Sequence, residues 1–298
     1  MNATRVLNRA GRGSGILTTA VLLLLPQLRA AEISRIYVVS ARNGTRISTH
    51  TPDGRRVEPT IQLGYSMSTG IAVDATGRIY VSHRAPINQI TSFEPDGKPA
   101  PLIINPAMGV FNKLNGVYGI ALDEVGKIYT LIANTATNNG AIAAFTAEGQ
   151  RTGPMVFTGQ NDAHFAIDRA GRIYVVSQST RIMKTFDETG KETTPTLTAG
   201  ITPHAIAIAP DGKIYIANFL AVMTFLPNGQ RVEPTIRHGN TMGGTASPTA
   251  LAVDSGGRIY VGYSEVGANQ GLVAIYEPDG KLKANINTPG GIQAIAIH

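Results

Sequence analysis

The sequence predicts an all-β protein built from six copies of one unit. The chain has 298 residues, of which 43% are hydrophobic and 15% charged, so it can bury a substantial core. No window after the first thirty residues has a helical hydrophobic period. A tetrapeptide of the form Gly/Ser-Arg/Lys-Ile-Tyr recurs at Ser34–Tyr37, Gly77–Tyr80, Gly126–Tyr129, Gly171–Tyr174, Gly212–Tyr215 and Gly257–Tyr260. Such a period predicts a repeat architecture.

The first 31 residues have the pattern of an export signal. Residues 1–12 are basic, residues 13–28 are uncharged and leucine-rich, and two alanines follow. This order is typical of a secretory signal peptide. The uncharged stretch is shorter than the roughly 20 residues of a membrane span. We therefore expect a signal peptide at 1–31, a folded domain at 32–298, a secreted or periplasmic location, and no stable membrane span after cleavage. An uncleaved N-terminal anchor is the alternative.

Composition excludes several classes of site. The chain has no cysteine, which excludes disulfides, thiolate metal sites and a cysteine nucleophile. The formal net charge is +6, but four of the arginines lie in the first 31 residues, where there is no acidic residue. The remainder is nearly neutral. The basic residues of the tetrapeptides are spread over six units, so we expect no nucleic-acid interface.

Each unit is predicted to contain four strands. The first strand is an apolar run with a central alanine, such as Ile71–Val73 or Ile206–Ile208. A turn with Asp and Gly, such as Asp74–Gly77, precedes the tetrapeptide, which begins the second strand. A loop and a third strand follow. A second Gly-containing turn, such as Pro95–Gly97, leads to the fourth strand.

Two observations predict a six-bladed β-propeller of four-stranded antiparallel blades. The alanine-centred runs are apolar on both faces, as expected of strands packed between neighbouring sheets near a crowded axis. The first unit begins at its second strand, Ser34–Tyr37, and the last run, Ile295–Ile297, is a first strand without successors. Pairing the C-terminal inner strand with the N-terminal blade closes the ring and removes exposed edges.

The units resemble NHL repeats, for example in Phe165–Phe186. The resemblance covers essentially the whole chain after the signal, and it implies a six-bladed propeller related to the gluconolactonase and regucalcin type. That scaffold carries lyases, lactonases and pure binding modules, so the resemblance implies a fold and no single activity.

The mouth of the central channel, where the inner strands begin, is the expected binding site. Among its residues, His204 begins an inner strand and is expected to face the axis. His164 lies near the equivalent place one repeat earlier, beside Asp162. Asn218, Thr249 and Tyr118 are further mouth candidates.

Two imidazoles and a carboxylate could bind a divalent metal, and His204, His164 and Asp162 are the candidate ligands. Peptidyl-amidoglycolate-lyase propellers are similar in placing zinc-binding histidines after proline, and Pro203-His204 matches that pattern. His164 is displaced by one residue, and Thr249 stands at the third position. The gluconolactonase resemblance would imply calcium bound by Asn and Asp, but His204 and Thr249 occupy those places.

The sequence therefore predicts a complete propeller scaffold, but it contains no complete set of catalytic residues. We expect a non-catalytic, monomeric binding or interaction module that needs no cofactor and holds a peptide, glycan or small molecule at the channel mouth. The alternative is a metal-assisted hydrolase or lyase, gluconolactonase-like or amidoglycolate-lyase-like, that uses calcium or zinc at His204.

Overall fold

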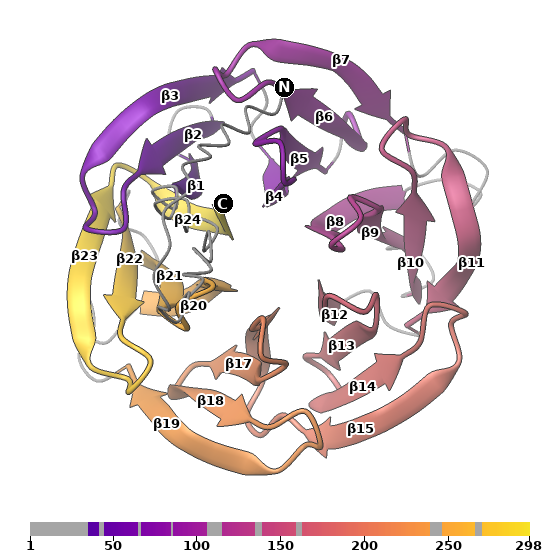
Figure 1. Cartoon of the computed structure of the whole chain (residues 1–298), viewed down its shortest axis with the longest axis vertical. Coiled ribbons are helices and arrows are strands. Elements are labelled where there is room, and N and C mark those ends of the chain that lie inside the picture. The colour runs from indigo at the N-terminus through magenta and orange to yellow at the C-terminus, as the bar shows by residue number, and fades with distance from the viewer. Residues whose placement is uncertain are drawn as a thin grey trace, which may run out of the picture. The chain divides into compact units, whose positions relative to one another are not determined.

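The computed structural model describes residues 35–41, 45–64, 67–84, 86–105, 115–134, 139–158, 163–238, 246–265 and 270–298, five of which (115, 134, 139, 163 and 265) are described by backbone alone. The predicted signal peptide lies outside these residues. The described part belongs to one compact unit, Ile33–His298. It consists of six four-stranded antiparallel sheets arranged as the blades of a six-bladed β-propeller (Figure 1), which confirms the predicted fold class. No helix of this part is long and apolar enough to cross a membrane.

The blades are numbered here in chain order, with the blade that contains both chain ends first. Blade 1 is β24 (Gly291–Ile297), β1 (Ile36–Ala41), β2 (Thr45–His50) and β3 (Arg56–Leu63). Blade 2 is β4 (Ser68–Val73), β5 (Ile79–His83), β6 (Gln89–Phe93) and β7 (Pro99–Ile104). Blade 3 is β8 (Asn115–Leu122), β9 (Ile128–Asn134), β10 (Asn139–Phe145) and β11 (Arg151–Phe157).

Blade 4 is β12 (Ala163–Ile167), β13 (Ile173–Ser177), β14 (Ile182–Phe186) and β15 (Glu192–Thr198). Blade 5 is β16 (Pro203–Ile208), β17 (Ile214–Asn218), β18 (Ala221–Phe225) and β19 (Arg231–Arg237). Blade 6 is β20 (Ala246–Val253), β21 (Ile259–Glu265), β22 (Gly271–Tyr276) and β23 (Leu282–Thr288).

The ring closes through the two ends of the described chain, as predicted. Strand β24 pairs antiparallel with β1, so that Ile36 lies opposite Ile297. The ladder continues to the last residue, because the Arg35 and His298 backbones exchange hydrogen bonds of 2.7 and 3.0 Å. Blade 1 therefore joins the C-terminal strand to the N-terminal three, and no blade is left with an unpaired inner strand.

Strand direction separates the two faces of the ring. The innermost strands all run the same way along the axis, and the hairpin turns after the first and third strands of each blade meet at one face. We call this the end face, because the inner strands end there. The face where the inner strands begin is the start face, and it carries the loops between second and third strands and between blades.

The six tetrapeptide tyrosines form the core between blades. Each is at most 3% exposed, and each lies in the second strand of its blade. The alanines at the centres of the inner strands leave room near the axis, where the blades converge. The apolar clusters join residues of neighbouring blades, such as Leu251 with Tyr215 and Ile71 with Val39, so the packing unit is the blade interface.

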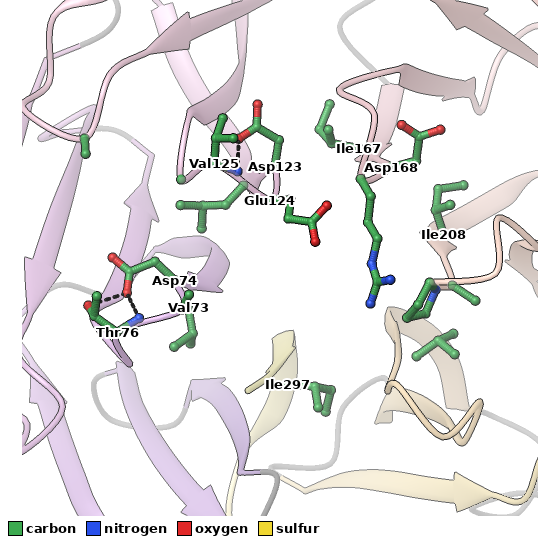
Figure 2. A pocket seen from close by; sticks show the side chains of 18 residues that line it. Val73, Asp74, Thr76, Asp123, Glu124, Val125, Ile167, Asp168, Ile208 and Ile297 are labelled. Carbon is green, nitrogen blue, oxygen red and sulfur yellow. Dashed lines mark hydrogen bonds between the residues drawn. The ribbon is translucent and has the colours of Figure 1, made fainter. Parts of the chain in front are cut away.

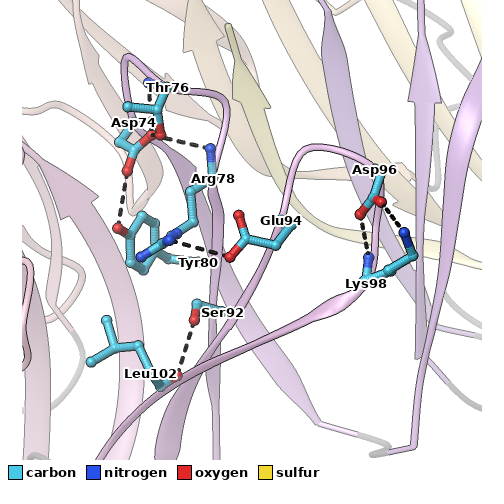
Figure 3. Close-up of polar contacts among 9 residues, drawn as sticks. All are labelled: Asp74, Thr76, Arg78, Tyr80, Ser92, Glu94, Asp96, Lys98 and Leu102. Carbon is cyan, nitrogen blue, oxygen red and sulfur yellow. Dashed lines mark hydrogen bonds and ion pairs between the residues drawn. The ribbon is translucent and has the colours of Figure 1, made fainter.

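A repeated carboxylate organises the end-face turns. In blade 2, one Asp74 oxygen accepts hydrogen bonds from the Thr76 and Arg78 backbones, and the other accepts one from the Tyr80 hydroxyl at 3.0 Å (Figure 3). Burial and the Asp74 carboxylate raise the pKa of Tyr80 to about 12. The same arrangement recurs at Asp123, Asp168 and Asp254. These repeated aspartates are structural, as a turn carboxylate of this kind suggests.

Replacing Asp254 by alanine is expected to destabilise the protein by about 2–3 kcal/mol. The Asp254 side chain is 1% exposed and holds the Arg258 guanidinium at 2.7 Å and the Tyr260 hydroxyl at 2.9 Å. Both groups would lose their partner inside the fold. Urea denaturation measures the change. Asp279→Ala is the matched control in an exposed turn and should change stability by less than about 0.5 kcal/mol. Equal effects would contradict a special role for the buried carboxylate.

Candidate functional site

The start face opens onto a small cavity on the channel axis. Its volume is about 120 Å³, and all six blades line it. The lining includes Thr69, Tyr118, His164, Thr249 and Gln293, close to the starts of the inner strands. Three of the predicted mouth residues, Tyr118, His164 and Thr249, are therefore brought together here.

Two threonines of this cavity join neighbouring blades. The hydroxyl of Thr249 donates to the Ile292 carbonyl at 2.7 Å, and that of Thr69 donates to the Val117 carbonyl at 2.9 Å. Both threonines lie at a β-bulge, where the pairing shifts by one residue. The bulge turns each hydroxyl toward the next blade, which makes these two threonines structural.

Tyr118 lies beneath an arginine at the edge of the cavity. The Arg84 guanidinium lies 4.3 Å from the centre of the Tyr118 ring, and one of its nitrogens donates to the Tyr118 hydroxyl at 3.1 Å. A guanidinium over a tyrosine face gains cation–π stabilisation and retains nitrogen donors for a ligand. This pair adds a positive charge to the cavity rim, and the sequence alone did not connect the two residues.

His164 reaches the cavity because blade 4 differs from the other blades. Each of the other five pairs inner and second strands through a bulge near the start face, whereas β12 pairs with β13 without one. The missing bulge offsets the one-residue displacement in the sequence. The Gln178 amide nitrogen donates to Nε2 of His164 at 3.0 Å.

His204, which was expected to face the axis, does not line this cavity. Its ring packs edge to face against Phe219, with ring centres 4.2 Å apart. Its Nε2 atom is buried and has no hydrogen-bond partner among the described residues. Burial lowers the pKa of His204, so the neutral imidazole is favoured. His204 lies at a bulge, as do the cavity-lining residues Thr69 and Thr249, so its packing against Phe219 and not the bulge distinguishes it from them.

Asn218 is buried and its side chain is bonded to the β17–β18 turn. Its side-chain oxygen accepts hydrogen bonds from the Leu220 and Ala221 backbones at 2.8 and 3.0 Å. Its carbonyl accepts from His238, whose other ring nitrogen accepts from the Tyr263 hydroxyl at 2.7 Å. These contacts connect blades 5 and 6 and stabilise the β17–β18 turn.

The proposed metal ligands are not brought together within the described residues. Asp162 lies outside them. In the part that is described, no three His, Asp or Glu side chains gather closely enough to hold a metal ion. His164 contacts Gln178 and His204 contacts Phe219, so the two imidazoles occupy different surroundings.

The end face carries a larger cavity that the sequence did not reveal. It has a volume of about 640 Å³ and lies where the inner strands end. Figure 2 shows apolar side chains such as Val73, Ile167 and Ile297 around it, with Glu124 directed toward its centre. Asp74, Asp123 and Asp168 contribute to the wall, but their oxygens are already bonded to the turns and tyrosines.

Exposed apolar side chains gather on the start face. The structure describes nine large hydrophobic residues that are at least one-third exposed, and only Val125 and Leu282 of these lie on the end face. The other seven lie at or near the start-face ends of strands: Met67, Ile103, Phe157, Ile182, Ile201, Phe219 and Leu220. An apolar surface concentrated on one face is typical of an interaction surface.

The comparisons with known proteins support the fold alone. No model of a protein family matches the chain, and no curated protein is similar to it in sequence. A crystal structure of a protein of unknown function from Bacteroides caccae superposes with a TM-score of 0.67 at 12% identity, covering 89% of this chain and 99% of the other.

Two further solved structures are similar. A chain of the nidogen/laminin complex has a TM-score of 0.65 at 14% identity, covering 89% of this chain and 98% of its own. The catalytically inactive virginiamycin B lyase from Staphylococcus aureus with quinupristin has a TM-score of 0.52 at 15% identity, covering 75% of this chain and 70% of its own. The fold is thus shared by a binding complex and a lyase.

Proposed function

We propose that the protein is an exported, non-catalytic binding module of the NHL type that holds a peptide, glycan or small molecule at its start face. The observation that carries this proposal is the concentration of exposed apolar side chains on that face. Burying such side chains against a partner provides a driving force of about 25 cal/mol per Å².

The mouth itself favours binding over catalysis. The hydroxyls of Thr69 and Thr249 already donate hydrogen bonds to neighbouring blades, and the side-chain oxygen of Asn218 already accepts one from a turn. The groups that remain toward the opening are the Arg84–Tyr118 pair, His164 and the exposed Gln293. Donors and acceptors on a rigid ring can orient a polar ligand without activating it.

A second candidate is a metal-assisted hydrolase or lyase centred on His204, with His164 and Asp162 as further ligands for calcium or zinc. The observation that favours it is the buried, unpartnered Nε2 of His204. A neutral imidazole nitrogen is a common ligand for zinc, and burial keeps this one neutral.

Replacing Gln293 by arginine tests the binding module. Gln293 is exposed and lines the mouth cavity, so the longer side chain should fill the cavity and leave the fold intact. Ligands retained by the wild-type protein on peptide and glycan arrays should bind Gln293→Arg at least about tenfold more weakly. Val125→Arg on the end face is the control and should bind normally.

The wild-type protein also allows the binding module to be distinguished from the metal-assisted enzyme. The binding module predicts no turnover of lactones or esters that depends on added calcium or zinc. It also predicts no metal-dependent rise in melting temperature, because a metal that binds only the native state must raise it. Metal-dependent turnover that His204→Ala abolishes would replace the binding module by the enzyme.

A further inference from the structure

The start face carries no acidic side chain among the residues whose side chains are described. The aspartates and glutamates whose side chains are described all lie in the end-face turns or within three strand residues of them, and Glu265, at the start-face end of β21, is described by its backbone alone. This follows from the topology, because the Asp-containing hairpin turns of every blade meet at one face. Every ion pair between described residues accordingly takes its carboxylate from the end-face side.

Positive charge remains on the start face. Arg46, Arg84, Arg181 and Arg237 lie at the start-face ends of their strands. Arg46 donates to the Pro289 carbonyl, and Arg84 lies on Tyr118. The side chains of Arg181 and Arg237 are exposed and form no hydrogen bond or ion pair with any described residue. Neither arginine forms an ion pair with a carboxylate in the part of the chain that the structure describes.

These two arginines flank exposed apolar side chains on blades 4 and 5. Arg181 is next to Ile182, and its carbonyl accepts from Ala199 at 2.8 Å, which brings the segment before Ile201 beside it. Arg237 pairs with Ala221, the neighbour of Leu220.

Phe219 precedes Leu220 and packs on His204. We call the set Arg181, Ile182, Ile201, Phe219, Leu220 and Arg237 the blade 4–5 patch. The exposed fractions of its apolar members are 38, 45, 51 and 58% for Ile182, Ile201, Phe219 and Leu220.

We propose that the blade 4–5 patch binds an acidic peptide segment that carries large apolar side chains. The inference rests on the proposed function and names its partner. The apolar members would bury the partner's hydrophobic side chains, and the guanidinium groups would each receive a carboxylate through two nitrogen donors. No acidic side chain described on this face competes for them or repels the partner.

A peptide fits this patch better than an anionic membrane does. The apolar members belong to two neighbouring blades, and each of these blades also carries one of the two arginines. Carboxylates and hydrophobic residues likewise occur side by side along a peptide. A membrane would instead require a broad basic rim around an inserted apolar tip.

Binding to immobilised short peptides, measured by biolayer interferometry with the full chain, tests the proposal. One pool mixes Asp and Glu with Leu, Ile and Phe. A second replaces the acids by Lys, and a third replaces the apolar residues by Ser. The first pool should bind at least about tenfold better than the others, and binding should weaken with added salt. Equal binding of all pools would overturn the proposal.

Charge reversal identifies the surface. Arg181→Glu combined with Arg237→Glu should weaken binding of the acidic pool by more than about tenfold. Arg151→Glu, an exposed arginine at the end-face side of blade 3, is the matched control and should bind normally. Likewise Phe219→Ser combined with Leu220→Ser should weaken binding, whereas Val125→Ser should not. Unchanged melting temperatures verify folding.

The outcomes separate this inference from the proposed function. Suppose that Gln293→Arg abolishes peptide binding while the arginine reversals leave it intact. That result would support the binding module but would overturn the blade 4–5 patch as its binding surface. Retention by vesicles with about one-third phosphatidylserine, without retention by any peptide pool, would overturn the peptide as partner. Loss of binding in the patch variants alone, with Gln293→Arg binding normally, supports the patch and moves the binding site away from the channel mouth.

Discussion

A chain that ends at Gly290 is expected to lose cooperative folding. The truncation removes β24, the inner strand of blade 1, and uncovers the N-terminal strand β1 along its whole length. Ile292 is fully buried and Ile295 is 8% exposed. Each such side chain contributes about 1.5–3 kcal/mol when buried. The truncation also removes the hydrogen bonds between β24 and β1 and would expose Ile36 and Val38, which adds to the loss of stability. The total reaches at least the lower part of the ordinary 5–15 kcal/mol stability of a domain.

Thermal unfolding followed by circular dichroism, together with size-exclusion chromatography, measures this effect. The truncated chain should show no sharp transition, or should aggregate through its open edge. The control is a circular permutant in which residues 291–297 precede Arg35 through a copied Asp-Ala-Thr-Gly turn, whose Asp takes the place of His298. It should fold, because the Arg35 and His298 backbones already exchange hydrogen bonds. A truncated chain that melts like the wild type would show that blade 1 does not depend on its C-terminal strand.

Acid is expected to destabilise the protein strongly below about pH 6.5. His83 is fully buried, and burial lowers the pKa of its imidazole to about 4, well below the ordinary value for histidine. Its Nδ1 lies 3.0 Å from the Ser68 hydroxyl and its Nε2 lies 2.8 Å from that of Thr91. Burial also lowers the pKa of His50 and of His238. The folded state therefore holds neutral imidazoles.

The direction of the pH effect on stability depends on whether the folded or the unfolded state binds protons more readily. Above about pH 6.5 both states hold neutral histidine, and the full stability is present. Between about pH 6.5 and pH 4 the unfolded chain gains protons that His83 in the folded chain does not, so stability falls as pH falls. One pKa unit corresponds to about 1.4 kcal/mol, so His83 alone removes about 2–3 kcal/mol by pH 4.5.

Urea denaturation at about pH 7 and pH 4.5 measures the difference. His83→Gln should lower stability at neutral pH and reduce the pH dependence, because glutamine does not titrate in this range. His298→Gln, at the exposed chain end, is the matched control for loss of a histidine and should leave stability at neutral pH unchanged. A wild-type protein that is equally stable at both values would contradict the assignment of neutral buried histidines.

The sequence by itself determined the architecture of this protein. The six tetrapeptides, the alanine-centred runs and the Asp-Gly turns act over a few residues, and each specifies a strand or a turn locally. The split blade was also readable, because a first strand at the C-terminus and a missing first strand at the N-terminus complement each other. Strand pairing leaves few other ways to satisfy those backbone groups.

The site depended on details of tertiary structure. His204 lies at the same kind of bulge as cavity-lining residues of other blades, yet its ring packs against Phe219. The absence of that bulge in blade 4 brings His164 into the cavity. Such bulges have no marker in the residues that form them, and a shift by one residue reverses the direction of a side chain.

The separation of charge between the faces also appeared only in three dimensions. Each turn carboxylate is visible in the sequence, yet only the direction of the strands shows that all these turns meet at one face. Arg181 and Arg237 lie 56 residues apart in the chain. They flank one patch because the neighbouring blades 4 and 5 present their loops side by side.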